Sequence, residues 1–239
     1  MMVAGTVRGF RAARHGIVYA APRRRLRREI GLTFDDGPSS EWTPAILDLL
    51  RAHDARATFF ILGASVAGRE EILRRTAAEG HELANHLFTH SDPATLADED
   101  LRTELEQTST LLERTVGSTP ELFRPPYAET DFRVAEVARR AGFAYTVLRS
   151  VDPADWETDD ADLIADRVLS GAGRGSIVCL HDALPPEPLK GSPTRQPTVE
   201  ALARVVPELG RRGYRLVTVS ELLGRRPAMR PGQAGGLVT

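Results

Sequence analysis

Residues 29–38 read EIGLTFDDGP, and this stretch decides the fold that we expect. Its first six residues are mainly apolar or β-branched, which is typical of a buried strand. The pair Gly37–Pro38 breaks that strand and indicates a turn. Two carboxylates, Asp35 and Asp36, therefore stand directly after the carboxyl end of a buried strand.

Strand-like and helical segments alternate from this point to about residue 223. The expected strands are residues 29–34, 57–62, 82–85, 121–124, 144–148, 176–180 and 215–218; the expected helices are 43–53, 70–79, 98–116, 131–141, 159–170, 198–212 and 219–223. We expect Thr43 to cap the first of these helices, with Pro44 at its first position. Such alternation implies a parallel sheet with helices outside, and about seven β/α units favour an α/β fold of the distorted (β/α)7-8 barrel type.

The chain length of 239 residues suits one barrel domain, which we place at residues 29–224. Residues 1–28 hold eight arginines and no acidic residue, and we expect them to form a flexible basic arm. Residues 225–239 are expected to form a loose C-terminal tail. The 23 basic and 33 acidic residues outside the arm give that part a net charge of about −10, which disfavours binding to nucleic acid.

The sequence argues against an intrachain disulfide, a membrane span and an export signal. Cys179 is the single cysteine, so an intrachain disulfide cannot form. No apolar run reaches the ~18 residues of a membrane span. The longest apolar stretch of the arm, residues 17–21, is shorter than the ~7 residues of an export signal core, so we expect a cytoplasmic protein. The oligomeric state is left open.

Polar residues that often carry chemistry follow the expected strands one after another. They are Asp35 and Asp36 after the first strand, His86 and His90 after the third, Arg124 after the fourth, Asp152 and Asp155 after the fifth, and His181 after the sixth. The carboxyl ends of parallel barrel strands gather on one face, where active sites usually lie. The sequence therefore predicts that these side chains meet.

Two segments have the composition of a metal site. His86 and His90 in HLFTH are four residues apart, so on a helical turn they could share one ion, although isolated pairs of this kind are more often surface or capping histidines. Asp35 and Asp36 point opposite ways in extended chain, so one could bind the ion while the other faces a reacting water; a turn rich in Asp, Gly and Pro is the alternative. Two imidazoles and one carboxylate leave positions open for water and substrate.

These segments and four others resemble the NodB-type polysaccharide deacetylases, carbohydrate esterase family 4, and look most like chitooligosaccharide deacetylases. The resemblance covers about residues 29–223. The matching strings are TFDDGP at 33–38, ATFFILG at 57–63, GHELANHLFTHS at 80–91, RPPY at 124–127, VDPADW at 151–156 and SIVCLHD at 176–182. Their order and spacing make a chance match very improbable.

The resemblance implies a division of labour among the matching residues. Asp36, His86 and His90 would hold a divalent ion, zinc in the first place, with cobalt, nickel or manganese as alternatives. Asp35 would be the general base for the attacking water, and Arg124 would hold Asp35 in place.

The resemblance also implies how the reaction ends. His181 would be the general acid that protonates the leaving amine, and Asp152 would orient His181 and tune its pKa. The backbone N–H near Tyr127 would help to stabilise the tetrahedral oxyanion.

The expected contacts to substrate come from Pro125, Tyr127, Trp156 and Cys179. This chain departs from the family pattern at Ala128, where glycine is common, at Arg149, where tryptophan often stands, and at Cys179, which replaces the leucine of the acetyl-methyl pocket. Cysteine is a small hydrophobe, so this pocket should stay apolar and become roomier.

The leading hypothesis is thus a metal-dependent hydrolase that removes an N-acetyl group from an amino-sugar oligosaccharide or glycoside. A tailoring deacetylase, amidase or esterase acting on a small metabolite is the first alternative. A catalytically inactive carbohydrate-binding barrel is the second, which the intact set of acidic and histidine residues opposes.

Overall fold

The computed structural model describes residues 16–21, 27–128, 130–186, 191 and 193–225 of the chain. Its described strands form one eight-stranded sheet in the order β1-β6-β5-β4-β3-β2-β7, with β8 pairing with β2 as well, and every pairing is parallel. The strands are β1 Ile17–Val18, β2 Glu29–Asp35, β3 Thr58–Ile61, β4 Glu82–Asn85, β5 Leu122–Phe123, β6 Tyr145–Val147, β7 Ile177–His181 and β8 Arg215–Val217.

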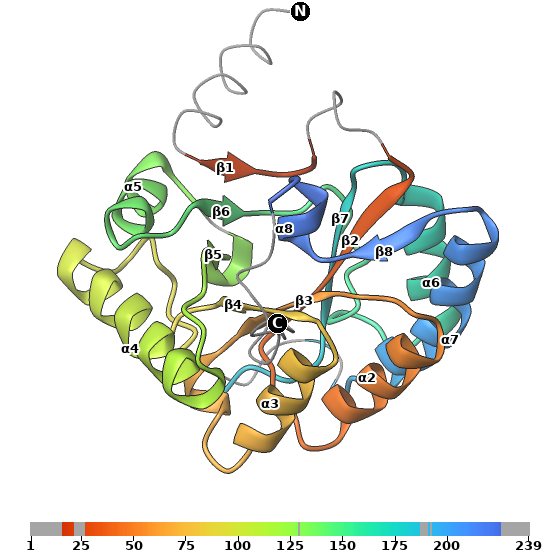
Figure 1. Ribbon diagram of the computed structural model, residues 1–239, viewed down its shortest axis with the longest axis horizontal. Helices are drawn as coiled ribbons and strands as arrows, with labels where there is room; N and C mark the ends of the chain where they lie inside the picture. Colours follow the sequence, from red (N-terminus) through yellow and green to blue (C-terminus); the bar gives the residue numbers. More distant parts are fainter. Residues whose placement is uncertain (1–15, 22–26, 129, 187–190, 192, 226–239) are drawn as a thin grey trace, which may run out of the picture.

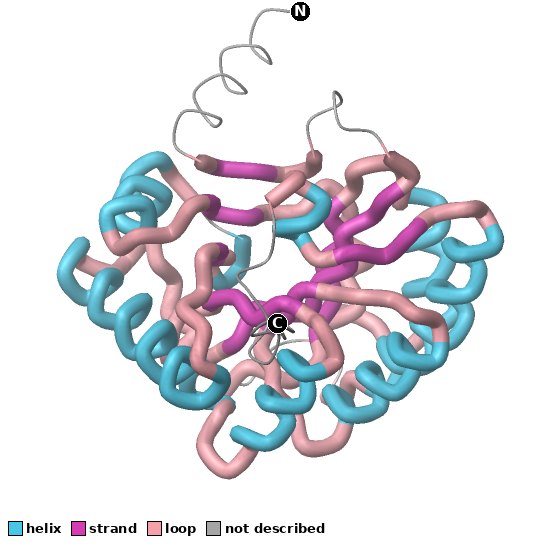
Figure 2. The backbone as a smooth tube through the Cα atoms, viewed as in Figure 1, coloured by secondary structure: helices cyan, strands magenta, loops and turns pink. Residues whose placement is uncertain are grey.

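The sheet curls until the segment after β6 reaches β7. Val151, which follows β6, forms an isolated parallel bridge with Val178 of β7. Helices surround the strands on the outside, as Figures 1 and 2 show. These outer helices are α2 Trp42–Ala52, α3 Glu70–Ala78, α4 Asp98–Val116, α5 Phe132–Arg140, α6 Ala161–Gly171 and α7 Gln196–Arg211. The remaining helical elements are the short α8 Val219–Leu222 and the 3-10 turns η2 Gly63–Ser65 and η3 Pro126–Ala128. The fold is the predicted α/β type, a distorted barrel of parallel strands.

Two hydrophobic clusters stabilise the two faces of this sheet. Phe59 belongs to the cluster between the strands and the outer helices, and Phe60 belongs to the cluster that includes residues of α8. Neighbouring residues of a strand point to opposite faces, so one strand supplies both cores. Val219 and Leu222 bring α8 into the second cluster. The apolar runs of the sequence therefore fix each strand by burial on both sides.

Two residues of the predicted N-terminal arm belong to the sheet. Ile17 and Val18 pair with Thr146 and Val147 of β6, and Ile17 is buried. This pairing covers the backbone of β6, which would otherwise be an open sheet edge. Residues 1–15 and 22–26 of the predicted arm, and 226–239 of the predicted tail, lie outside the described residues.

The first helix begins differently from the prediction. Its first residue is Trp42, and Thr43 is not its N-cap. The Thr43 hydroxyl instead donates to Asp182 Oδ2 at 2.5 Å and accepts from Ser39 N. A long-range partner in the loop after β7 thus competes with the local capping role. Within the described ranges, no helix combines the length and apolarity needed to cross a membrane.

Candidate active site

Strained backbone marks the loops that follow β2, β4, β5 and β6. Among the described residues other than glycine, six have a positive φ, and five of them lie in these loops. The left-handed region costs such residues ~1–3 kcal/mol each and is retained mainly where function requires it. The five are Asp36 (77°), Leu87 (66°), His90 (64°), Tyr127 (59°) and Ala154 (50°).

Asp36, His86 and His90 meet as a compact set of possible metal ligands. Asp36 Oδ1 lies 3.5 Å from His86 Nε2 and 3.3 Å from His90 Nε2, and all three side chains are buried. An ion with tetrahedral bonds of ~2.0–2.2 Å keeps its ligand atoms ~3.3–3.6 Å apart. The residues present therefore fit a divalent ion. Burial raises the pKa of Asp36, but the two neighbouring imidazoles lower it well below its usual range.

Backbone groups fix the orientation of the first imidazole. His86 Nδ1 lies 2.8 Å from the carbonyl oxygen of Arg124. Because a carbonyl oxygen only accepts, Nδ1 must carry the proton, which leaves Nε2 as the ligand atom. The loop itself is held by Glu104 of α4, whose Oε2 accepts from the N–H groups of Phe88 and Thr89 at 2.8 Å each. The sequence gives no local signal for Glu104, because it comes from a different element.

Asp35 is a buried carboxylate held by a buried guanidinium. Arg124 Nη1 donates to Asp35 Oδ1 at 2.7 Å and to Thr33 Oγ1 at 2.7 Å. The Arg124 Nε and Nη2 atoms donate to the carbonyl oxygens of Val147 and Leu148, and its guanidinium lies 4.0 Å from the ring centre of Phe60. Burial raises the pKa of Asp35, but Arg124 and the nearby imidazoles lower it below its usual value.

The turn between these carboxylates and α2 rests on another buried acid. A Cβ atom at Gly37 would clash with the buried carboxylate of Asp182, so a larger residue there would displace that carboxylate. Asp182 N donates to the carbonyl oxygen of Asp35 at 3.2 Å, and burial raises the pKa of Asp182 to about 7. The segment after β7 thereby positions the segment after β2.

His181 is held by Asp155, and the prediction that Asp152 orients it is wrong. Asp155 Oδ1 lies 2.7 Å from His181 Nδ1, and Asp155 Oδ2 accepts from His181 N and from Thr198 Oγ1. Asp152 is exposed and accepts from Arg149 Nε at 2.6 Å instead. Burial lowers the pKa of His181, but the charge and hydrogen bond of Asp155, together with Asp36 and Asp35, raise it to about 9.

A local turn explains this exchange of roles. Asp152 Oδ1 accepts from Ala154 N, and Ala154 takes a left-handed conformation. The chain reverses at this point, so the second aspartate of VDPADW becomes buried while the first stays at the surface. Both aspartates follow the same strand, and the spacing alone does not choose between them.

The predicted substrate contacts are distributed over the same edge. Tyr127 is 47% exposed and packs edge-on against His90, with ring centres 4.8 Å apart. Pro125 is buried, and Trp156 is half-buried beside Asp155. Cys179 is buried, and its thiol donates to Asp35 Oδ2 at 3.3 Å. The structure thus brings Tyr127 and Cys179 into contact with the site.

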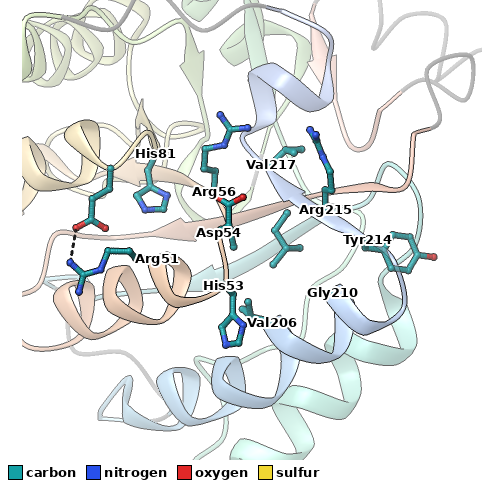
Figure 3. Close-up of a pocket in the computed structure, with 13 residues that line it drawn as sticks. Arg51, His53, Asp54, Arg56, His81, Val206, Gly210, Tyr214, Arg215 and Val217 are labelled. Atoms are coloured by element: carbon teal, nitrogen blue, oxygen red, sulfur yellow. Dashed lines mark ion pairs between the residues drawn. The ribbon is translucent and has the colours of Figure 1, made fainter. Parts of the chain in front are cut away.

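A cavity of about 640 Å³ opens at the other end of the barrel, near the amino ends of β3, β4 and β8 (Figure 3). Its arginines are matched by carboxylates: Arg56 pairs with Glu221 at 2.8 Å, and Arg215 with Glu29 at 3.1 Å. None of the predicted site residues lines this cavity. We therefore place the chemistry at the carboxyl ends of the strands.

The fold and the site define the class: a parallel α/β barrel whose strand ends gather two imidazoles and a carboxylate beside a further carboxylate and imidazole, as in metal-dependent hydrolases. Comparisons agree with this. The polysaccharide deacetylase family model matches residues 23–146, and this chain belongs to that family of hydrolases.

Named relatives and a solved structure cover most of the chain. A peptidoglycan-N-acetylglucosamine deacetylase of Bacillus cereus is 41% identical over 81% of this chain and 87% of its own length. A chitooligosaccharide deacetylase of Sinorhizobium fredii is 40% identical over 77% of this chain and 86% of its own. The crystal structure of a peptidoglycan N-acetylglucosamine deacetylase superposes with a TM-score of 0.83, at 32% identity, over 92% of this chain and 99% of that one.

Proposed function

We propose that this chain hydrolyses the N-acetyl group of an N-acetylglucosamine unit in an oligosaccharide or larger glycan and releases acetate. The observation that carries the proposal is a three-residue ligand set that lies beside one carboxylate and one imidazole, each held by a buried partner. The family and the names of the relatives support an acetylated amino sugar as substrate.

Asp35 is placed to act as the base. Its Oδ1 is engaged by Arg124, and among the described residues its Oδ2 accepts the weak thiol hydrogen bond of Cys179 alone. With its pKa held below the usual value, the carboxylate is ionised at neutral pH and can accept the proton of the attacking water. The water oxygen then bonds to the acetyl carbon.

His181 is placed to act as the acid. Its Nδ1 is engaged by Asp155, so Nε2 can carry the proton that the leaving nitrogen needs. As the carbon–nitrogen bond breaks, that proton passes to the nitrogen, and acetate and a free amine leave. Asp35 pairs with His181 in the β2–β7 register, so the base and the acid lie on neighbouring strands. The base is ionised while the acid carries its proton, as the reaction requires.

Asp36, His86 and His90 would hold the divalent ion, which we propose to be zinc. A set of two imidazoles and one carboxylate is typical of catalytic zinc, and cobalt, nickel and manganese fit it as well. When bound, the ion would make the water more acidic and polarise the acetyl carbonyl.

The substrate extends beyond one sugar in our proposal. A cavity of about 310 Å³ at the carboxyl ends of β1 and β6 is lined by Tyr19, Leu148, Arg149, Ser150 and Asp152. Tyr19 is 50% exposed, and an exposed aromatic ring beside polar groups suits a sugar face. Arg149 stands where members of the family that this chain resembles often have tryptophan. Its ion pair with Asp152 would therefore supply hydrogen bonds in place of an aromatic wall.

Acetate release from N-acetylglucosamine oligomers of graded length tests the proposal. Zinc-loaded protein should release acetate from the oligomers, and Tyr19→Ala should raise KM for the longer ones while leaving a single glycoside unaffected. Equal rates for all lengths would favour the small-metabolite alternative. No acetate from any acetylated sugar, with the ion bound, would contradict the proposed function.

A further inference from the structure

Three potential metal ligands also gather outside the set formed by Asp36, His86 and His90. Asp35, Cys179 and His181 each offer a ligand atom, and these atoms all lie within 4.8 Å of one another. We infer that these three residues form a second site, which binds zinc or another thiophilic divalent cation and inhibits the enzyme.

Strand register produces this cluster. In the β2–β7 pairing, Asp35 lies opposite His181, and Cys179 is two residues before His181 on β7. Residues two apart on a strand point to the same face, so the thiol and the imidazole share one side of the sheet with the carboxylate. The arrangement is thus built into the core of the barrel rather than into a loose surface loop.

The ligand atoms have suitable orientations. Asp155 engages His181 Nδ1 at 2.7 Å and leaves Nε2 for an ion, and such carboxylate support is common for metal-bound histidine. Cys179 Sγ and Asp35 Oδ2 are 3.3 Å apart, which is close to the ~3.5 Å separation expected for sulfur and oxygen on one tetrahedral zinc ion. His181 is the least buried of the three, so we expect the ion to reach the cluster from its side.

Charge is balanced when the cation binds. The thiol loses its proton to solvent, and a sulfur–metal bond replaces the S–H bond without any change of oxidation state. Asp35 and the thiolate then contribute two negative charges to the divalent ion. Arg124, whose Nη1 lies 3.6 Å from Cys179 Sγ, remains on the Asp35 Oδ1 side of the cluster.

Binding at this cluster would occupy the base and the acid together. This inhibitory effect rests on the proposed function, whereas the binding itself does not. Excess zinc should therefore lower kcat/KM by ~10²-fold or more at saturation, because both proton-transfer groups are lost. Cys179→Leu would remove the sulfur ligand and fill the apolar space.

The test counts metal ions and reads a spectrum. Wild-type protein in excess zinc should hold two ions, and Cys179→Leu and Cys179→Ser should each hold one. His90→Asn, which damages the first set, should still bind one cobalt ion with a thiolate-to-cobalt charge-transfer band, and the double variant with Cys179→Ser should lose that band. A single ion in the wild type, equal metal content in the Cys179 variants, or a cobalt spectrum without the thiolate band would each overturn the second site.

The activity measurement separates this inference from the proposed function. Enzyme with one zinc equivalent should release acetate, excess zinc should suppress that release, and Cys179→Leu should resist the suppression. If no form releases acetate while two ions still bind, the proposed function fails and the second site stands. If acetate is released equally at one and at many equivalents of zinc, the inhibitory effect is wrong.

Discussion

Charged residues are arranged differently at the two ends of the barrel. At the amino ends of the strands, the cavity in Figure 3 is lined by arginines that are paired with acids, such as Arg56 with Glu221. At the carboxyl ends, Asp35 and Asp36 are adjacent buried carboxylates that share a small space with three imidazoles. Backbone strain is also concentrated at the carboxyl ends, because five of the six positive φ values among the described non-glycine residues lie in loops there.

This difference separates stability from function. Paired surface charges contribute ~0–1 kcal/mol each and tolerate change. Buried carboxylates and imidazoles gathered around one space carry a large desolvation cost that favours a bound cation. The carboxyl ends therefore hold an arrangement that folding alone does not explain, and substitutions at the two ends should have different consequences.

The largest effect should follow from removing a ligand of the first metal set. His90→Ala should lower the content of the bound divalent ion and reduce kcat/KM by ~10³-fold or more, because the charge that would stabilise the reacting carbonyl is lost. Metal analysis together with acetate release measures both effects. Arg56→Ala at the other end is the matched control, and it should keep the ion and the activity. Equal losses in both variants would contradict the functional difference between the two ends of the barrel.

The two aspartates of VDPADW should differ strongly. Asp155→Asn should lower kcat by ~10²-fold, because His181 loses the charge that supports its protonated form. Asp152→Asn should change kcat by less than ~3-fold, because its partner is the half-exposed Arg149. Steady-state kinetics on the two variants decides between the predicted and the observed partner of His181, and the reverse order would restore the role first given to Asp152.

The pH profile should carry the signature of the same pair. The pKa of His181 is raised to about 9 by Asp155 and the site carboxylates, so the acid keeps its proton up to that pH. Activity should then fall as the pH rises through about 9. In Asp155→Asn this alkaline limb should move down by ~1 pH unit or more. Profiles of kcat with coincident alkaline limbs would show that Asp155 does not set this pKa.

A smaller effect on stability is expected at the amino ends. Burial lowers the pKa of His81 from 6.5 to about 4, and His81 Nδ1 accepts from Ala57 N. A histidine that stays neutral in the folded state gives stability that is present above pH 6.5 and is lost as the pH falls towards 4. This loss amounts to ~3 kcal/mol.

His81→Asn keeps an acceptor for Ala57 N and removes the titration. Metal-free wild type should therefore lose ~3 kcal/mol more than the variant between pH 7 and pH 4 in denaturant unfolding. Parallel curves for the two proteins over this range would show that burial of His81 is not the cause. When loaded with metal at neutral pH, wild type and His81→Asn should have the same metal content.

The sequence predicted the architecture well, because a strand buried on both faces appears as a continuous apolar run. The runs around Phe34 and Phe59 are continuous and apolar, and turns with glycine or proline separate them from the helices. It missed β1, because Ile17–Val18 is too short to show a period and gains its place only from the exposed edge of β6. It also placed Thr43 as a cap, because the competing acid, Asp182, is distant in the sequence.

The site was predictable as a set of positions and less so as a set of pairs. Strand ends converge whatever the loops do, so Asp36, His86 and His90 could be grouped from the alternation and the motifs. Pairing depends on loop conformation instead. The left-handed turn at Ala154 buries Asp155 and exposes Asp152, and no pattern of residue types announces that turn.

The most direct test of the central claim compares wild type with Asp35→Asn, each loaded with one equivalent of zinc and given an N-acetylglucosamine oligomer. Asp36, His86 and His90 stay intact, so both proteins should hold the ion. If Asp35 is the base, acetate release by the variant should fall by ~10²–10⁴-fold with the metal content unchanged. Equal acetate release by two equally loaded proteins would contradict the account.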